Sequence, residues 1–442
     1  MPLMDDWKQH FEGKKITVMG LGLLGRAVGD AEFLAQNGAD LIVTDLKGDE
    51  DLRASLKVLE PYPNVKYRLG GHEMEDFKNR DYILKAAGVP FDSPYIKEAE
   101  KNNIPVKMSA SWFVALSKIP VVGVTGTRGK STVTHMLYDI MQAAGMETLL
   151  GGNVRGVSTL AFLPQVKENS LALMELDSWQ CKGFGDEEMS PSVAVFTSFF
   201  KDHMNYYHDN MGHYFADKAQ LFLNQKPSDT LVATGSVAQK IQEYKKEPPS
   251  QLVVADEKPF PKEWKLSVPG EHNILNAQCA LAAARALGID DEVTKQALEN
   301  FKGVPGRLEL VREVKGIKIY NDTTATTPEA TRAGIDALDS GNKNLILIMG
   351  GADKGLPMDI LIPEVQNRTK KVILLAGSGT ETIKDKLSQA PIYEELSLAL
   401  QDAVDSAKEG DTILLSPAFA SFGMFKNEFD RGDQFNALVQ AI

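Results

Sequence analysis

The chain has 442 residues, of which 43% are hydrophobic and 24% are charged, as expected of a globular protein with two to four domains. Its formal net charge of −12 argues against a general nucleic-acid binder, so local cations, helix termini or a metal must hold any phosphate. The two cysteines, Cys181 and Cys279, form neither a disulfide framework nor a zinc pattern. Without a signal peptide before Trp7 or an apolar run of the ~20 residues that a membrane helix needs, we expect a cytoplasmic protein without membrane insertion.

A glycine-rich turn follows the first predicted strand, which runs from Lys15 to Met19. The turn, GLGLLG, spans Gly20 to Gly25, and a helix follows it to about Gln36. A second predicted strand begins at Asp40 and ends at the acidic residue Asp45. This arrangement is the dinucleotide fingerprint and predicts a Rossmann-like domain. NAD is one ligand for it, but the pyrophosphate of any nucleotide would suit the same helix terminus.

The stretch from Pro120 to Gly145 combines a buried strand, a glycine loop and an amphipathic helix. Such a loop brings backbone N–H groups and the helix N-terminus onto phosphate oxygens, while a lysine and a serine hydroxyl hold phosphate and Mg²⁺. The spacing is shorter than the usual phosphate-loop pattern, because Val124 stands where the first glycine belongs. An ordinary strand-to-helix turn with an exposed lysine is the alternative. The loop residues are Gly126, Thr127, Arg128, Gly129, Lys130, Ser131 and Thr132.

Acidic and histidine residues follow the next two predicted strands. Glu175 ends the strand that begins at Leu171, where a metal ligand usually lies beside a phosphate loop. A helix-capping or loop acid is the alternative. His203, His208 and His213 are spaced by five, which fits neither one helix face nor a zinc signature. We therefore expect no three-histidine metal site.

Further along, the residue types alone leave the roles of several polar side chains open. Lys218 lies within a predicted helix, where most lysines are solvated. Asn273 and Asn276 are one helical turn apart and could present amides to a base or cap the helix. After Gly303–Arg307 the chain alternates strands and helices again, with polar loops at the strand ends and a last helix from about Phe425, and this predicts a third α/β domain.

Taken together, these motifs resemble those of the Mur ligases of peptidoglycan assembly over essentially the full chain. The motifs are GLGLLG at Gly20, TGTRGKSTVT at Thr125, GGN at Gly151, MELDSWQ at Met174, KDHMNYY at Lys201, DKAQLF at Asp217, GEHNILNA at Gly270, GRLELV at Gly306, NDTTATTPEAT at Asn321, GGADKG at Gly350 and LSPAFASFGMFKN at Leu415. Within the family they are most similar to the members that add D-glutamate to UDP-N-acetylmuramoyl-L-alanine.

The resemblance implies a role for each matching residue. The phosphate loop with Lys130 holds ATP, Ser131 binds Mg²⁺, Glu175 and His203 bind a second Mg²⁺, and Lys218 is the lysine that the family carbamylates to bridge the metals. Adenine, phosphate and ribose contacts fall on Asn276, Arg307 and Asp322. The residues implied for the UDP-sugar are Leu23, Leu24, Asp45 and Asn153, and those for the amino acid are Thr326, Lys354 and Ser421.

Several residues depart from the pattern of these ligases. Arg128 replaces an Asn, Asp177 replaces a Ser, and Ala86-Ala87-Gly88 replaces Ser-Pro-Gly in the uridine pocket. Thr324 stands in place of a Lys, and Glu428 in place of an aromatic residue of the amino-acid pocket. The last two leave D-glutamate and L-glutamate both open as the substrate.

The leading hypothesis is therefore a monomeric, ATP-dependent amide-bond ligase with three α/β domains. Residues 1–108 form a Rossmann-like UDP-sugar domain, 109–303 a central ATP-binding domain, and 304–442 a Rossmann-like domain for the amino acid. Folate polyglutamylation shares the phosphate loop but should lack such a uridine domain. An NAD-dependent oxidoreductase would use Gly20–Gly25 and leave the TGTRGKST loop unexplained, and a nucleotide-gated interaction protein is the non-catalytic alternative.

Overall fold

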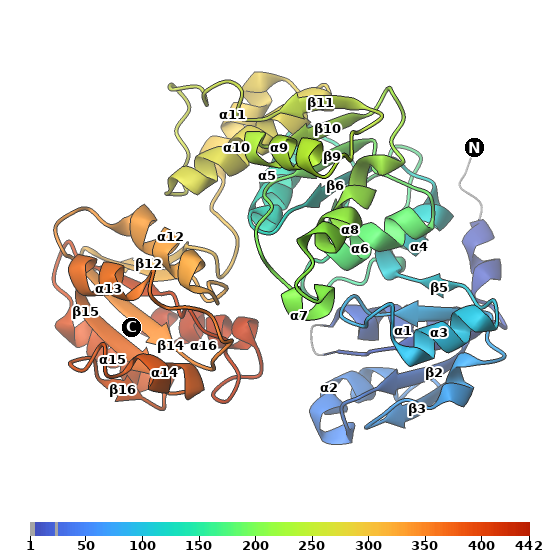
Figure 1. Ribbon diagram of the computed structural model, residues 1–442, viewed down its shortest axis with the longest axis horizontal. Coiled ribbons are helices and arrows are strands. Elements are labelled where there is room, and N and C mark those ends of the chain that lie inside the picture. Colours follow the sequence, from blue (N-terminus) through green and yellow to red (C-terminus); the bar gives the residue numbers. More distant parts are fainter. Residues whose placement is uncertain (1–4, 23–24) are drawn as a thin grey trace. The chain divides into compact units, whose positions relative to one another are not determined.

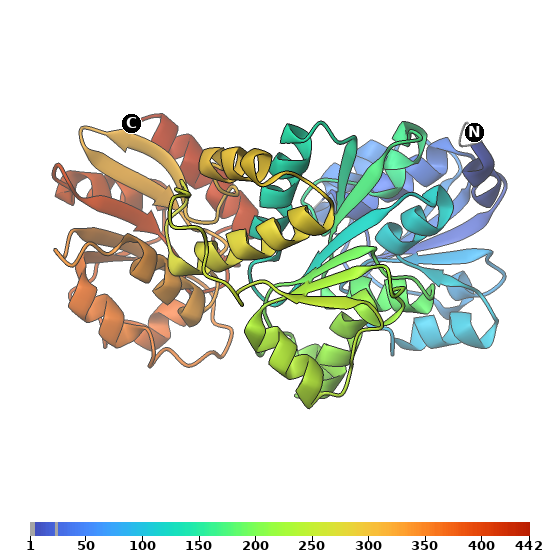
Figure 2. The same cartoon turned by 90° about the horizontal axis from the view of Figure 1, so that it is seen from above.

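The computed structural model describes residues 5–22 and 25–442, and it contains three β-sheets, each flanked by helices (Figures 1 and 2). The residues group into two compact units: unit 1 comprises Met1–Lys262 and Leu275–Ala297, and unit 2 comprises Glu263–Ile274 and Leu298–Ile442. Unit 1 holds the first two sheets and unit 2 holds the third. The predicted α/β class with three sheets is confirmed, whereas the domain limits at residues 108 and 303 stay a prediction.

The first sheet has five parallel strands in the order β3-β2-β1-β4-β5. These are β1 (Lys15–Met19), β2 (Asp40–Asp45), β3 (Val65–Leu69), β4 (Tyr82–Lys85) and β5 (Val106–Lys107). The helices are α1 (Arg26–Gln36), α2 (Asp49–Leu59) and α3 (Pro94–Lys101), with 3₁₀ turns at Asp5–His10 and Met74–Phe77. Because the strand order reverses beside β1, the glycine turn after β1 lies at the switch point where such sheets bind ligands.

The central strands of this sheet are buried on both faces, because successive side chains point to opposite sides. Ile16 and Val18 of β1 pack in one apolar cluster with Phe33 of α1. On the opposite face, Met19 packs in a second cluster with Ile96 of α3. The apolar layers hold the strands in register, so that the polar residues that follow them gather at one edge.

The second sheet has six parallel strands in the order β11-β10-β9-β6-β8-β7. These are β6 (Val121–Thr125), β7 (Thr148–Gly152), β8 (Leu171–Glu175), β9 (Val193–Phe196), β10 (Thr230–Ala233) and β11 (Gln251–Val254). Around them lie α4 (Ser109–Ser117), α5 (Lys130–Ala143), α6 (Ser178–Asp186), α7 (Met204–Tyr207), α8 (Met211–Leu223), α9 (Gly235–Glu243) and a 3₁₀ turn at Leu160–Gln165. Since β6 lies between β8 and β9, the loops after these three strands meet.

Two further helices, α10 (Glu271–Ala286) and α11 (Asp291–Asn300), each have residues in both units. Cys279 of α10 is buried, as its predicted place in an apolar helix requires.

The third sheet has the order β12-β13-β17-β14-β15-β16, and only the edge strand β12 is antiparallel. Its strands are β12 (Glu309–Val314), β13 (Ile317–Asn321), β14 (Leu345–Gly350), β15 (Thr369–Leu375), β16 (Ile392–Tyr393) and β17 (Thr412–Leu415). Its helices are α12 (Pro328–Leu338), α13 (Ile362–Arg368), α14 (Ser378–Ile383), α15 (Leu396–Ser406) and α16 (Glu428–Gln440). Helix α16 begins at Glu428 rather than about Phe425, because the Asn427 side chain caps it by accepting the N–H groups of Phe429 and Asp430.

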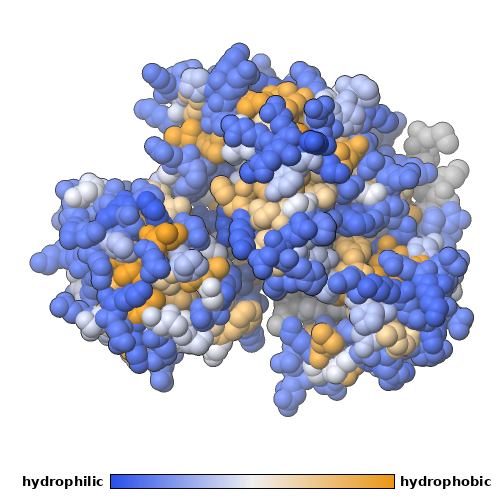
Figure 3. Space-filling view, viewed as in Figure 1, coloured by the Kyte–Doolittle hydropathy of each residue, from blue (hydrophilic) through white to orange (hydrophobic). Residues whose placement is uncertain are grey.

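No helix of the described residues is long and apolar enough to span a membrane. The face of the molecule drawn in the space-filling view is mostly hydrophilic, with small apolar patches (Figure 3).

Candidate active site

The phosphate loop joins β6 to α5 and is held by the segment after β9. The N–H of Thr127 donates to the carbonyl of Ser198 at 2.8 Å, and the N–H of Arg128 donates to the Ser198 hydroxyl at 2.8 Å. A Cβ on Gly126 would collide with the Thr197 hydroxyl, and one on Gly129 would come within 2.5 Å of Asn276 Oδ1. Both glycines also have positive φ, which side-chain-bearing residues rarely adopt. The loop is therefore a tight cradle that only these glycines permit.

Two lysines converge on this loop. Lys130 Nζ donates to the carbonyl of Gly126 at 2.8 Å, and Lys218 Nζ donates to the same carbonyl at 3.0 Å. Lys218 is 1% exposed, and burial together with the positive charge of Lys130 lowers its pKa to about 7. The glycine loop, the N-terminus of α5 and the Lys130 ammonium together create a site that suits a phosphate group.

Acidic groups lie at the ends of the strands beside the loop. Glu175, at the end of β8, is buried, and its Oε1 accepts a hydrogen bond from Asn153 Nδ2 at 3.0 Å. Ser131, in the first turn of α5, is also buried. In the described parts of the chain, no three His, Cys, Asp or Glu side chains are grouped as a metal site. Mg²⁺ usually binds through one or two protein carboxylates together with waters and substrate phosphates, and Glu175 is such a carboxylate.

Arg128 and His203 meet at Asp202. Arg128 NH1 lies 3.4 Å from Asp202 Oδ2, while Asp202 Oδ1 accepts the N–H of His203 at 2.9 Å. Burial alone would favour the protonated acid, but His203 and Arg128 hold the pKa of Asp202 below its ordinary value. His203 itself has φ near 53°, and burial lowers its pKa. Arg128, which replaces an Asn, thus ties the phosphate loop to the turn that carries His203.

Asp177, the other departure in unit 1, caps helix α6. Its side chain accepts the N–H of Gln180 at 2.8 Å, and the Gln180 side chain accepts the N–H of Asp177 at 3.2 Å. This reciprocal capping box explains why an acid is tolerated where a Ser is usual.

Asp45 lies at the glycine turn of the first sheet, as predicted, but it is engaged by the backbone. Its Oδ2 accepts the N–H groups of Leu21 at 2.8 Å and Gly22 at 3.1 Å. The N–H of Lys47 donates to its Oδ1 at 2.9 Å. The carboxylate thus takes two of the N–H groups that a pyrophosphate would use in a dinucleotide site. Leu23 and Leu24 lie outside the described residues.

Lys85, which sequence reasoning missed, holds the Ala86-Ala87-Gly88 loop. It is buried, and its Nζ donates to the carbonyls of Ala86 at 3.2 Å, Ala87 at 3.4 Å and Val89 at 2.7 Å. Burial lowers its pKa to about 7. The sequence does contain a signal for this role, because Lys85 is a charged residue at the end of the otherwise apolar strand YILK.

In unit 2, three loops at the carboxyl ends of neighbouring strands come together. The loop after β14 pairs with the loop after β17 through an antiparallel bridge between Ala352 and Ala420, and the N–H of Ala418 donates to the carbonyl of Ala325, after β13. Lys354 Nζ donates to Thr326 Oγ1 at 3.0 Å. The buried hydroxyl of Ser421 has no hydrogen-bond partner among the described residues. These three residues, predicted to bind the amino acid, therefore occur on loops that contact one another.

Thr324 and Glu428, the two residues of this unit that differ from the family pattern, both take part in hydrogen bonds between separate segments of the protein. Thr324 Oγ1 donates to the carbonyl of Gly306 at 3.0 Å, and Thr323 Oγ1 donates to the carbonyl of Glu428 at 2.7 Å. The fully buried Arg431 donates to Thr323 Oγ1 at 3.0 Å and to its carbonyl at 2.8 Å. Thr324 thus serves the loop conformation rather than a ligand carboxylate.

Asp322 and Arg307, predicted to contact nucleotide, differ in exposure. Asp322 is buried and accepts the Ser416 hydroxyl at 2.8 Å and the N–H of Leu308 at 3.2 Å. Burial raises the pKa of Asp322 to about 7. Arg307 is exposed on the preceding turn. Their contacts with nucleotide stay a prediction.

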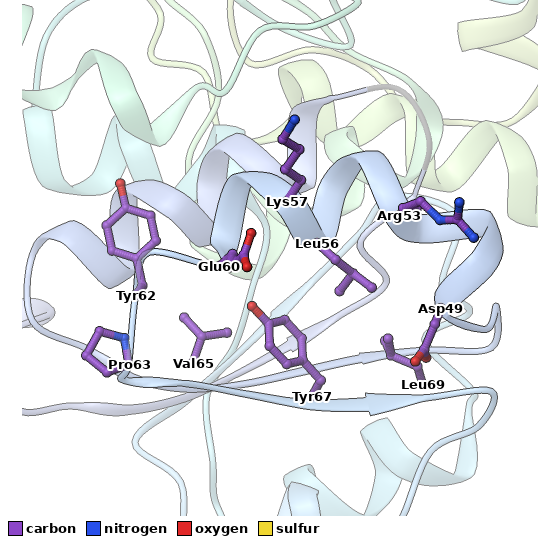
Figure 4. Close-up of a pocket in the computed structure, with 10 residues that line it drawn as sticks. All are labelled: Asp49, Arg53, Leu56, Lys57, Glu60, Tyr62, Pro63, Val65, Tyr67 and Leu69. Atoms are coloured by element: carbon purple, nitrogen blue, oxygen red, sulfur yellow. The ribbon is translucent and has the colours of Figure 1, made fainter.

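A surface cavity of about 810 Å³ lies elsewhere, between α2 and β3. Figure 4 shows Leu56, from the helix, and Tyr67, from the strand, pointing into it. None of the predicted site residues that the structure describes lines this cavity. Its lining consists of Asp49, Arg53, Leu56, Lys57, Glu60, Tyr62, Pro63, Val65, Tyr67 and Leu69.

These sheets and loops define a nucleotide-binding α/β protein with a phosphate loop at the centre of its second sheet. Three family models match the chain: "Mur ligase MurD-like, N-terminal domain" at residues 14–108, "Mur ligase middle domain" at 124–259 and "Mur ligase, glutamate ligase domain" at 306–419. The chain belongs to the Mur ligase family, as its motifs predict.

Curated relatives match over nearly the whole chain. The UDP-N-acetylmuramoylalanine--D-glutamate ligase of Roseiflexus sp. (strain RS-1) is 34% identical and the alignment covers 97% of this chain and 99% of the relative. The ligase of the same name from Borreliella burgdorferi (strain ZS7) is also 34% identical, over 96% of this chain and 97% of the relative.

Solved structures share the fold. The UDP-N-acetylmuramate-alanine ligase MurC of Thermotoga maritima has a TM-score of 0.64 at 21% identity and covers 97% of this chain and 99% of its own. MurF of Acinetobacter baumannii has a TM-score of 0.60 at 15% identity, over 98% of this chain and 92% of its own. The folylpolyglutamate synthase of Thermotoga maritima has a TM-score of 0.56 at 14% identity and covers only 75% of this chain and 94% of its own.

Proposed function

We propose that the chain is an ATP-dependent ligase that adds D-glutamate to UDP-N-acetylmuramoyl-L-alanine in peptidoglycan precursor synthesis. The observation that carries this proposal is the one-third identity, over nearly the full length of both chains, to ligases named for this product. The phosphate cradle around Lys130 supplies the chemistry that such a ligase needs. The test is phosphate release that requires both the UDP-sugar and an amino acid, and release independent of the UDP-sugar would contradict the proposal.

The reaction activates a carboxylate, which is a poor electrophile because its two oxygens share a negative charge. A carboxylate oxygen of UDP-N-acetylmuramoyl-L-alanine attacks the γ-phosphorus of ATP, and ADP leaves. The amine of glutamate then attacks the carbonyl carbon of the acyl phosphate, which releases phosphate and a proton. The protein contributes mainly positioning and charge neutralisation, with Lys130 and the N-terminus of α5 on the phosphates.

The family uses Mg²⁺, and the residues of the cradle fit it. When bound, Mg²⁺ neutralises phosphate charge and orients the reacting oxygens. We propose that Ser131 holds one ion and that Glu175, His203 and a carbamylated Lys218 hold a second. Two observations support this proposal. Glu175 and Ser131 are buried beside the loop, and the Nζ atoms of Lys218 and Lys130 both donate to the carbonyl of Gly126. Carboxylate-type oxygens are the ligands that Mg²⁺ prefers.

NAD is expected not to bind. Its pyrophosphate would have to displace Asp45 from the N–H groups of Leu21 and Gly22. The displaced Asp45 carboxylate would then lie beside the pyrophosphate without its N–H partners, and the repulsion between the two anions disfavours this binding mode. Calorimetric titrations with NAD and with UDP-N-acetylmuramoyl-L-alanine measure this directly. Comparable affinities would favour the oxidoreductase alternative.

D-Glutamate is expected to be the preferred amino acid. A dicarboxylate entering a protein of net charge −12 needs dedicated donors, and Lys354, Thr326 and the buried Ser421 hydroxyl provide them. We expect kcat/KM for D-glutamate to exceed that for L-alanine by at least about 100-fold, because a neutral side chain leaves these donors unmatched. The measurement compares D-glutamate, L-glutamate, D-aspartate and L-alanine.

L-Glutamate remains the alternative substrate, because Thr324 and Glu428 change the surroundings of one carboxylate. An equal or higher kcat/KM with L-glutamate would overturn the stereochemical assignment.

Lys354→Met should raise KM for the amino acid without changing KM for ATP. Lys408→Met, which removes an exposed lysine elsewhere in unit 2, is the matched control.

A further inference from the structure

Helix α1, which follows the glycine turn of the first sheet, packs closely on the segment that leads from β7 toward β8. A Cβ on Gly25 would come within 3.3 Å of the Cα of Gly156, and one on Gly29 within 2.8 Å of the Cβ of Ser158. The next residue of the helix, Asp30, accepts the Ser158 hydroxyl through Oδ1 at 2.7 Å. The helix and this segment are therefore held together within unit 1 by close packing and a hydrogen bond.

Arg26, the first residue of α1, is linked to Glu175 by hydrogen bonds through Asn153. Its NH1 donates to Asn153 Oδ1. The amide of Asn153 in turn donates from Nδ2 to Glu175 Oε1 at 3.0 Å, and the N–H of Asn153 donates to the Glu175 carbonyl at 2.7 Å. The neighbouring Gly152 has no space for a side chain, since a Cβ there would collide with the Glu175 carbonyl.

The chemistry of the three groups allows only one orientation of the Asn153 amide. A guanidinium has donors and no acceptor, and an ionised carboxylate has acceptors and no donor. Arg26 therefore requires the amide oxygen on its side, which leaves the NH₂ group facing Glu175. A flipped amide would place NH₂ against the guanidinium and oxygen against the carboxylate, and both contacts would be repulsive. Within the described residues Glu175 Oε2 accepts no hydrogen bond, so one oxygen is anchored and the other is available to a cation.

We infer that Arg26 is a positioning residue for Glu175, acting through Asn153, and that it fixes this carboxylate for the Mg²⁺ ion proposed above. The inference rests on the proposed function for the identity of the cation. Arg26, which would order the metal ligand Glu175, directly follows the glycine turn of the first sheet. Partners that orient a ligating carboxylate typically change metal affinity 10- to 100-fold when they are removed.

The experiment measures Mn²⁺ binding by electron paramagnetic resonance, with a non-hydrolysable ATP analogue present and no UDP-sugar. Arg26→Met is expected to weaken Mn²⁺ binding about 10-fold, and Arg26→Lys, which keeps a donor, to restore part of it. Arg53→Met, which removes an exposed guanidinium from α2, is the matched control and should bind Mn²⁺ as the unmodified protein does. If Arg26→Met fails to fold, the Arg26→Lys variant carries the comparison.

A double-mutant cycle decides whether Arg26 acts through Asn153. Asn153→Ala alone should weaken Mn²⁺ binding, and adding Arg26→Met to it should cost less than about 2-fold more. A full additional loss would overturn the inference. So would an Arg26→Met variant with unchanged Mn²⁺ affinity and a raised KM for the UDP-sugar, because Arg26 would then be a direct nucleotide contact. The binding measurements hold whether or not turnover requires the UDP-sugar, so failure of the proposed function is seen separately.

Discussion

Replacing Lys130 with alanine is expected to lower kcat by at least about 100-fold, the scale for the loss of one preorganised charge contact in a phosphoryl-transfer site. Lys130 Nζ donates to the carbonyl of Gly126 at 2.8 Å, and the side chain is only partly buried. The free energy of unfolding should therefore change by no more than about 1 kcal/mol. Phosphate release with both substrates and thermal unfolding measure the two effects.

The control for this variant is Lys57→Ala, which removes an exposed lysine from α2 of the same unit. It should keep full turnover and an unchanged unfolding temperature. Near-native turnover of Lys130→Ala would mean that the cradle does not hold the transferred phosphate. A loss of turnover accompanied by unfolding would assign Lys130 to the stability of the loop instead.

The phosphate loop could be predicted from the sequence because its signals are local. An apolar strand, two glycines and an amphipathic helix in succession fix the backbone, and the structure has β6 and α5 around them as expected. The same holds for the turn after β1, where residues Gly20 and Gly25 both have positive φ. Periodicity of 2 and 3.6 residues decides such elements without help from distant parts of the chain.

The burial of Lys218 could be predicted from its position in the helix, although the residue type alone suggests a solvated lysine. Tyr214, Lys218 and Phe222 are spaced by four and share one face of α8, and all three are buried. A lysine in the middle of an apolar stripe is the signal. The contact of Arg26 with Asn153 could not be predicted this way, because 127 residues separate the two in sequence.

The hydrogen bonds of Asp45 and Thr324 also depend on tertiary structure. The residue types indicate that both can bond a ligand, and both lie at strand ends where ligands bind. In the structure they bond backbone groups of their own unit, at Leu21 and Gly306. Sequence patterns locate the polar loops but do not decide between a ligand and the protein's own backbone as the partner.

Lys218→Ala is expected to reduce turnover about 1,000-fold, the upper end for one essential charged group, and a short carboxylic acid should restore part of it. Lys218 is fully buried and its pKa is lowered to about 7, by burial and by the charge of Lys130, so much of the amine is neutral at pH 7. The neutral nitrogen can bond the carbon of CO₂ and release a proton. The resulting carbamate would place anionic oxygens where an ammonium would repel Mg²⁺. Below about pH 6 the amine is protonated, so both the carbamate and turnover should be lost.

The carbamate itself is measured by ¹³C NMR of the protein equilibrated with ¹³CO₂, and its resonance should be absent from Lys218→Ala. Because removing a buried side chain leaves a cavity, Lys218→Met provides a variant of similar volume that should fold and remain inactive. Lys240→Ala, which breaks an exposed pair with Glu243 on α9, is the matched control and should keep full turnover. Full activity of Lys218→Met, or an unchanged ¹³C resonance in it, would show that the carbamate does not form on this lysine.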